Sequence, residues 1–235
     1  MSVSTPKTAY LRGLRHGAPF LVILLPFSML FGVVAIEANL TIAQAMGFSL
    51  LVIAGAAQFA AVQLMTENAP MLVIVATALA VNMRMAMYSA SLTPHIGKAP
   101  LGARAAISYF LVDQGYALSI MEYEKHPNET TANKVAYYFG TISLMCPLWY
   151  VFTLVGALIG ARIPEEFALD FAVPIAFLAM TAPMLRTRAH ITAAVTAVVL
   201  AILFAWVPYN GGLLIASISA MCVDACVETR TEQPS

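Results

Sequence analysis

Charged residues are scarce in this chain. Lys, Arg, Asp and Glu make up 10% of its 235 residues, whereas hydrophobic residues make up 60%. A soluble domain has roughly 25% charged residues, so this composition excludes an ordinary soluble fold. The mean hydropathy of +0.81 indicates a polytopic membrane protein. The formal net charge is zero, which gives no electrostatic reason to expect a nucleic-acid partner.

The sequence also lacks the common motifs of enzymes and metal sites. It has no G-x-x-x-x-G-K-[ST] loop for nucleotide hydrolysis, no H-E-x-x-H for zinc and no G-x-S-x-G for a serine hydrolase. Its three cysteines and four histidines form no disulfide framework and no metal site. We therefore expect neither a cofactor nor an enzyme. An intramembrane enzyme that pairs Asp113 with Asp170 remains as an alternative.

What the chain does contain is a series of long hydrophobic runs. A helix needs about 20 apolar residues to cross a hydrocarbon core about 30 Å thick. The runs predict an all-α membrane protein of seven to eight segments, forming one transmembrane domain over 1–235 with a cytoplasmic tail at 1–16. They lie near 17–37, 42–65, 69–92, 105–121, 135–160, 167–185, 190–207 and 211–227.

The basic residues predict that the second run does not cross the membrane. If every run crossed and the N-terminus were cytoplasmic, Lys98 and Arg104 would lie outside, against the tendency of basic loops to lie inside. If 42–65 instead enters and returns, broken at Gly55, these two residues lie inside. The loop 122–134 then lies outside.

A second interrupted helix is expected in 167–185, broken near Pro174. With the linking helix 105–121 between them, residues 17–100 and 135–227 would then be two repeats of opposite orientation. Inverted repeats with broken helices at mid-membrane are a common design among transporters. In this arrangement Arg162 lies inside.

Polar residues within the apolar runs are the candidate functional groups. A charge at mid-bilayer costs roughly 2.5–3.5 kcal/mol on insertion scales, so such a residue normally faces a cavity or a partner. We expect them to bind substrate or couple its movement to an ion. They are Gln58, Asn82, Arg84, Tyr88, Asp113 and Gln114.

Each of these residues also has a simpler interpretation. Gln58 either binds a ligand or joins neighbouring helices. Arg84 either meets a substrate carboxylate or Asp113, or extends toward the headgroups. Asp113 either carries a proton or forms a fixed ion pair. Because either charge would be costly to bury alone, we predict that Arg84 and Asp113 interact.

Four pieces of sequence together suggest a family. They are Pro26-Phe with Gly32, Ala54-Gly-Ala-Ala-Gln58-Phe, Asn82-x-Arg84-x-x-x-Tyr88-Ser, and Asp113. In this pattern the chain resembles the AzlC-type branched-chain amino acid exporters over most of residues 12–120. Two departures are that Gln114 stands where the family usually has Glu, and Ser28 where it usually has Gly.

The resemblance implies a secondary transporter that exports leucine, isoleucine, valine or analogues, together with a small AzlD-type membrane subunit. An ion gradient suffices as the driving force, because one charge moved through 100 mV supplies about 2.3 kcal/mol. We expect a multi-pass protein of the inner membrane with a cytoplasmic N-terminus. Pro26, Gly32, Gly55 and Pro174 are expected to break helices or act in gating. A non-transporting assembly subunit is the alternative.

Overall fold

The computed structural model describes residues 5–162, 188–207 and 211–231. All regular elements in these residues are helices, which confirms the all-α prediction. Three of the helices are long and apolar enough to cross a membrane: Pro6–Glu37, Met71–Ile96 and Thr131–Gly160. The chain divides into two compact units, residues 1–169 and 170–235, and each is described by itself. The seven to eight segments and their union in one domain stay predictions.

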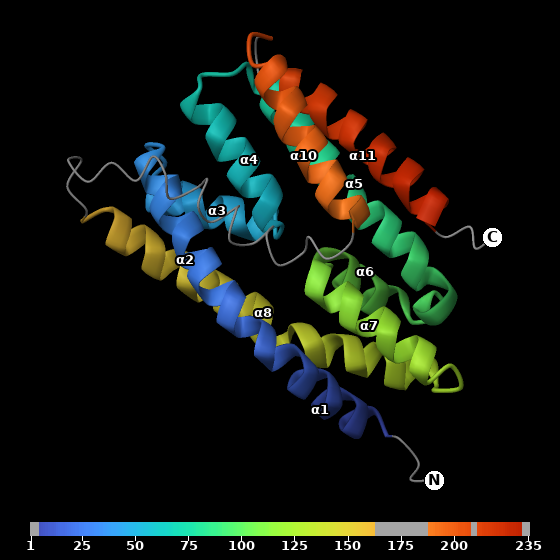
Figure 1. The fold of residues 1–235 in the computed structure, drawn as a ribbon. Helices are drawn as coiled ribbons and strands as arrows, with labels where there is room; N and C mark the ends of the chain where they lie inside the picture. Colours follow the sequence, from blue (N-terminus) through green and yellow to red (C-terminus); the bar gives the residue numbers. More distant parts are fainter. Residues whose placement is uncertain (1–4, 163–187, 208–210, 232–235) are drawn as a thin grey trace. The chain divides into compact units, whose positions relative to one another are not determined.

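The first span of the first unit begins earlier than the hydrophobic run predicts. It consists of α1 (Pro6–Gly17), a short 3-10 turn (Ala18–Phe20) and α2 (Leu21–Glu37). The Thr5 hydroxyl caps α1 by accepting from the backbone N–H of Thr8. Residues 6–16 of the expected tail are therefore helical, and their place in the cytoplasm stays a prediction. These residues are helical because α1 packs along α8 (Thr131–Gly160), burying Ala9 and Gly13 (Figure 1).

Glycines allow the first span and α8 to pack backbone against backbone. A Cβ on Gly32 would clash with the Thr153 carbonyl of α8, and one on Gly156 would clash with the Met29 carbonyl of α2. Small residues at helix contacts are typical of membrane proteins, where close packing replaces the hydrophobic effect. Gly13, near the start of the first span, similarly lies against Tyr137. The contacts follow the same order along both helices, from Gly13 beside Tyr137 to Gly32 beside Thr153. The first span and α8 therefore run in the same direction.

This parallel course corrects part of the expected topology. The start of α8 lies at the same end of the unit as the start of α1, so 122–134 is on the N-terminal side, not opposite to it. Arg162, just after α8, is at the other end. An inverted repeat would make 17–37 and 135–160 antiparallel, and that is wrong for this pair. The repeat as a whole includes residues outside the described range and stays a prediction.

The run 42–65 is two half-helices, as predicted. Helix α3 (Ile42–Leu51) and helix α4 (Gly55–Thr66) are separated by non-helical backbone at residues 52–54. Phe31 of α2 contacts Phe48 of α3 and Phe59 of α4, with ring centroids 6.1 and 5.5 Å apart. Both halves therefore lie beside the same part of α2, and the chain turns back at the break.

Helix α5 (Met71–Ile96) then runs the full length of the unit. Leu64, near the end of α4, packs on Ile74 in the first turns of α5. At the other end of α5, Ile96 packs in one cluster with Ala9 of α1 and Tyr137 of α8. Helix α5 is therefore antiparallel to the first span, and it returns the chain to the N-terminal side.

The prediction of one linking helix at 105–121 is wrong, because the structure has two short helices there. They are α6 (Leu101–Tyr109) and α7 (Asp113–Lys125), separated at residues 110–112. Ile107 of α6 lies in a cluster with Ile96 of α5, so α6 packs against the last turns of α5.

Helix α7 also follows the second half of α5, in the direction of α5 itself. The Tyr116 hydroxyl is 3.1 Å from the Ser91 hydroxyl, and the Tyr123 ring is 5.4 Å from His95. The pair α6–α7 is thus a second hairpin, entering and leaving at the end opposite to α3–α4. Half-helices of 9 to 13 residues reach only about half of a 30 Å core at 1.5 Å per residue.

The second unit consists, in its described part, of α10 (Arg188–Leu203) and α11 (Gly211–Thr231). A Cβ on Gly212 would clash with the Phe204 carbonyl, so the two helices pack closely at their turn. Both match predicted runs. The segment 167–185 and its Pro174 lie outside the described residues.

Candidate functional site

The breaks in the two hairpins meet. The Tyr109 hydroxyl, at the end of α6, donates to the Leu50 carbonyl at the end of α3, at 2.6 Å. Ile53 from the first break and Phe110 and Val112 from the second pack against one buried cluster, together with Tyr88 of α5. Two interrupted segments far apart in sequence therefore form one contact region around the middle of α5.

Tyrosines satisfy the helix ends that these breaks create. The last carbonyls of a helix have no partner within it, and leaving them unpaired in a membrane is costly. Tyr109 satisfies Leu50 of α3, and the Tyr138 hydroxyl donates to Phe110, just after α6, at 3.1 Å. At the opposite ends, α4 and α7 begin without a side-chain cap. Their first N–H groups give a positive end.

Arg84 and Asp113 form the predicted ion pair. Arg84 Nη1 is 2.9 Å from Asp113 Oδ2, and the side chains are 28% and 39% exposed. The interpretation in which Arg84 extends toward the headgroups is therefore wrong. Asp113 is the first residue of α7, where the helix dipole favours a carboxylate. Within the described residues, Arg84 Nε and Asp113 Oδ1 are buried and have no hydrogen-bond partner.

Tyr88 extends this cluster by stacking on Tyr116, a residue that the sequence did not single out. Their ring centroids are 4.1 Å apart and their planes differ by 10°. Tyr88 also lies close enough to Asp113 and Arg84 to interact with both charges. The spacing Asp113-x-x-Tyr116 could have revealed Tyr116, because residues three apart share a helix face.

Gln58 is fully buried beside the first break. Its Nε2 donates to the Ser49 hydroxyl at 3.0 Å and so joins α4 to α3, while its Oε1 has no partner among the described residues. Asn82 likewise has a buried, unpaired Oδ1. Gln114 is half-buried in the first turn of α7. The structure thus places these amides on the elements that form or flank the two breaks.

The residues expected to break helices have different positions. Gly55 is the first residue of α4, and a Cβ there would come within 2.7 Å of Phe27 and 2.9 Å of Trp149. Pro26 and Gly32 lie inside α2, which is continuous through both, so neither breaks a helix. Gly32 serves close packing on α8. Whether any of the three acts in gating stays a prediction.

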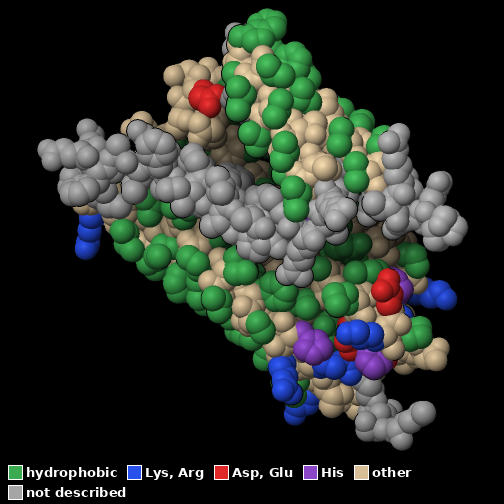
Figure 2. All heavy atoms as spheres, in the orientation of Figure 1, with side chains coloured by type: hydrophobic (Ala, Val, Ile, Leu, Met, Phe, Trp, Pro, Cys, Tyr) green, Lys and Arg blue, Asp and Glu red, His purple; other side chains and the backbone are tan. Residues whose placement is uncertain are grey.

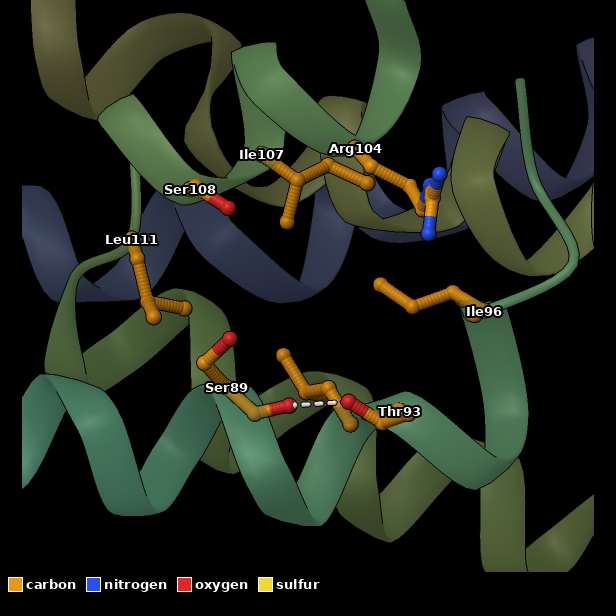
Figure 3. Close-up of a pocket in the computed structure, with 9 residues that line it drawn as sticks. Ser89, Thr93, Ile96, Arg104, Ile107, Ser108 and Leu111 are labelled. Atoms are coloured by element: carbon orange, nitrogen blue, oxygen red, sulfur yellow. Dashed lines mark hydrogen bonds between the residues drawn. The ribbon is translucent and has the colours of Figure 1, made fainter. Parts of the chain in front are cut away.

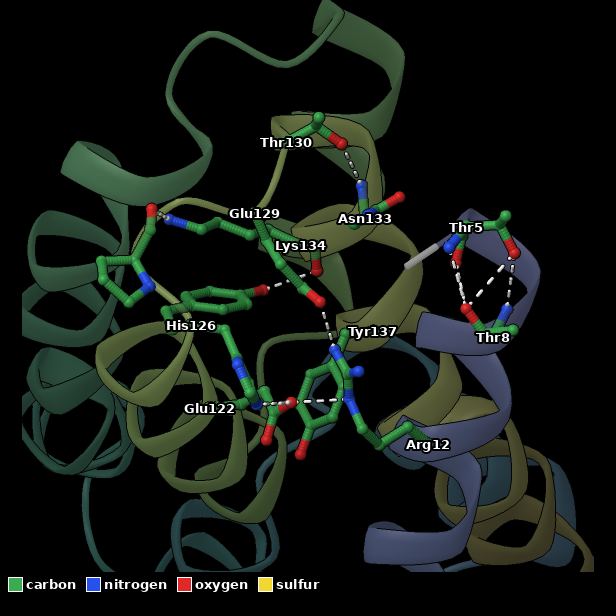
Figure 4. Close-up of polar contacts among 12 residues, drawn as sticks. Thr5, Thr8, Arg12, Glu122, His126, Glu129, Thr130, Asn133, Lys134 and Tyr137 are labelled. Carbon is green, nitrogen blue, oxygen red and sulfur yellow. Dashed lines mark hydrogen bonds and ion pairs between the residues drawn. The ribbon is translucent and has the colours of Figure 1, made fainter. Parts of the chain in front are cut away.

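A second polar cluster, which the sequence did not predict, joins α1 to α7 and α8 (Figure 4). Arg12 Nε is 2.6 Å from Glu122 and its Nη2 is 2.7 Å from Glu129. Glu122 is only 5% exposed, and the His16 ring is 2.8 Å from the Tyr137 hydroxyl. Figure 2 shows the charged and histidine side chains of this unit gathered mainly at this end.

Comparison with known proteins decides the family. The model of the family described as AzlC protein matches residues 19–163, which include both hairpins, α5 and α8. The chain belongs to the AzlC family. This is a membrane transport family, and no enzymatic activity is known for it. No curated protein and no solved structure gives a significant match.

The AzlC match agrees with the resemblance inferred from the sequence motifs and supports a transport-related role in a membrane. It covers all six polar candidates, from Gln58 to Gln114, and the meeting point of the hairpins. The matched part of this AzlC protein is therefore the part that carries the candidate site.

Proposed function

We propose that this AzlC protein is the large subunit of a secondary transporter that exports branched-chain amino acids. The observation that supports it best is the set of buried, unpaired polar atoms beside the helix breaks. Gln58, Asn82, Arg84 and Asp113 each have one such atom within the described part of the chain. A buried polar atom without a partner costs about 1–3 kcal/mol, and a polar ligand removes that cost.

These atoms suit a zwitterion. The oxygens of Gln58, Asn82 and Asp113 accept hydrogen bonds, as an ammonium group requires. Arg84 Nε donates, and the uncapped N-terminal end of α4 adds N–H groups and a partial positive charge for a carboxylate. Discontinuous helices whose N-termini point at anionic groups are a recurring way to build transporter sites.

The apolar part of the substrate would meet Met85. This residue follows Arg84 in α5 and packs against the cluster at the breaks. Methionine is flexible and polarizable, so it adapts to side chains of different shape. This supports a group of related substrates, leucine, isoleucine and valine, over a single one.

We place the protein in the inner membrane with a cytoplasmic N-terminus, and the charge distribution supports this orientation. In the described part of the first unit, the basic residues near the end with α1 outnumber those at the opposite end, where Arg162 lies. Basic residues favour the cytoplasmic side. Those near α1 are Lys7, Arg12, Arg15, Lys98, Arg104, Lys125 and Lys134. An ion gradient would drive export.

A small AzlD-type subunit would complete the transporter. Large apolar side chains are exposed along α5, among them Leu79, Met83 and Met87 on the helix that carries Arg84. A partner packed there would enclose the polar residues, which lipid alone cannot satisfy. The alternative is that these residues only bind the partner and transport nothing.

The test is counterflow of labelled leucine in vesicles that contain this chain, the partner, or both. We expect rapid leucine accumulation with both subunits, little with this chain alone, and competition by isoleucine and valine but not by lysine. Equal accumulation by the chain alone would contradict the need for a partner. No accumulation of any branched-chain amino acid with both subunits would refute the proposed function and favour the assembly role.

A further inference from the structure

A cavity separate from the ion pair lies between the second half of α5 and α6 (Figure 3). Its volume is about 230 Å³. Pockets for drug-sized ligands have volumes of about 300–1,000 Å³, so this cavity suits a smaller solute. Its lining residues come from both helices and the turn between them: Ser89, Leu92, Thr93, Ile96, Gly97, Arg104, Ile107, Ser108 and Leu111.

The cavity has two chemically different parts. Its apolar wall is made of Leu92, Ile96, Ile107 and Leu111, all at most 5% exposed. Arg104 lies at one end of the space, and Ser89 and Ser108 lie at the other, as Figure 3 shows. A cation beside a buried apolar wall matches a small molecule with a carboxylate at one end and an aliphatic chain at the other.

Arg104 is suited to hold that carboxylate. No described carboxylate lies within ion-pair distance of it, in contrast to Arg12 and Arg84. A guanidinium presents parallel N–H groups that match the two oxygens of a carboxylate. The wall residues are leucines and isoleucines, which pack well against a branched chain.

The position of the cavity connects the N-terminal side to the ion pair. Arg104 and Ile96 lie near the end of the unit that carries the basic residues. Ser89 is five residues after Arg84, about 7.5 Å along the helix, and Leu111 is two residues before Asp113. The cavity therefore lies between the N-terminal side of the unit and the point where the two hairpins meet.

We propose that this cavity is a second substrate site, where Arg104 captures the carboxylate of a branched aliphatic amino acid before it reaches Arg84 and Asp113. This inference rests on the proposed function for the identity of its ligand. The site needs no ammonium group for recognition, so a carboxylate without an amine binds it.

The test is equilibrium dialysis of labelled 4-methylpentanoate, which is leucine without its amine, against the full-length protein in detergent. We expect Arg104→Gln to weaken binding at least ten-fold and Arg104→Lys to weaken it less. Ile107→Trp should also abolish most of the binding, because it fills the cavity and keeps the cation. Lys98→Gln, which removes an exposed cation next to the cavity, is the matched control and should change nothing.

Equal binding by the native chain and Arg104→Gln, or equal losses in Arg104→Gln and Lys98→Gln, would overturn the second site. The second site would also be overturned if the native chain retained a bound anionic phospholipid that Arg104→Gln lost, because the cavity would then hold a lipid phosphate. Arg104-dependent binding without leucine counterflow would uphold the site and refute the proposed function. Leucine counterflow combined with binding that does not depend on Arg104 would uphold the proposed function and refute the second site.

Discussion

Replacing Arg84 with alanine is expected to reduce leucine counterflow about 100-fold. The change removes charge-assisted hydrogen bonds, each worth about 1.5–3 kcal/mol, and about 1.4 kcal/mol corresponds to a factor of ten in rate. It also leaves Asp113 without its partner at 2.9 Å. Because both side chains are partly exposed, we expect a loss of only about 1–2 kcal/mol in folding stability. Lys98→Ala is the control and should transport normally.

A double variant separates transport from a purely structural ion pair. Arg84→Gln with Asp113→Asn removes both charges and keeps side chains of similar size. If the pair only stabilises the fold, this variant should recover both the thermal stability and the counterflow that Arg84→Ala loses. We expect stability to recover and counterflow to stay low, because the substrate loses Arg84 Nε as a donor and Asp113 as a charged acceptor. Recovered counterflow would contradict a direct role in transport.

Gly156→Val is expected to prevent the first unit from folding. Any Cβ at Gly156 would overlap the Met29 backbone of α2, and the same holds for Gly32 against Thr153. Backbone atoms cannot move aside as a flexible side chain can, so α2 and α8 would have to separate. Overpacking in a core that can adjust costs about 1–3 kcal/mol, and we expect more here. Little monodisperse protein should remain in size-exclusion chromatography.

Glycines in open positions give the matched control for this prediction. A Cβ on Gly102 of α6 would meet nothing within 4 Å. Gly102→Ala should therefore leave thermal unfolding unchanged or raise its midpoint slightly, because alanine favours a helix by up to about 1 kcal/mol. A stable, monodisperse Gly156→Val protein would show that α2 and α8 do not pack as the structure has them.

The sequence predicted the membrane fold and the main polar contact for clear physical reasons. Composition and run length indicate membrane helices directly. The small residues around Gly55 predict the break between α3 and α4. The cost of burying a lone charge predicts that Arg84 pairs with Asp113, and the structure confirms this contact at 2.9 Å.

The second hairpin was missed because its break contains no glycine or proline. Residues 110–112 are Phe-Leu-Val, which in a membrane read as part of a continuous helix. What stabilises the break is tertiary: Tyr138, far along the chain, donates to the Phe110 carbonyl, and Arg84 holds Asp113 at the start of α7. An acidic residue at a helix N-terminus is favourable, so Asp113 was the one local signal.

The predicted direction of α8 is wrong for a related reason. If 105–121 were one helix that crosses the membrane, every later segment would run in the opposite direction to the one observed. The sequence did not predict the contacts of Arg12 with Glu122 and Glu129. The composition of residues 1–16 is typical of a polar tail, and that of 122–134 is typical of a solvated loop. Helix packing through Gly13, Gly32 and Gly156 also depends on which faces meet, and this information is not local to any run.

The most direct test of this account is sided labelling of single cysteines that flank the two hairpins. In a background without native cysteines, the positions are Glu37 and Thr66 around α3–α4, and Lys98 and Lys125 around α6–α7. An impermeant thiol reagent should label the first two from one side of the membrane and the last two from the other. Labelling of Glu37→Cys and Thr66→Cys from opposite sides, or of Lys98→Cys and Lys125→Cys from opposite sides, would contradict the meeting hairpins on which the proposed transport site depends.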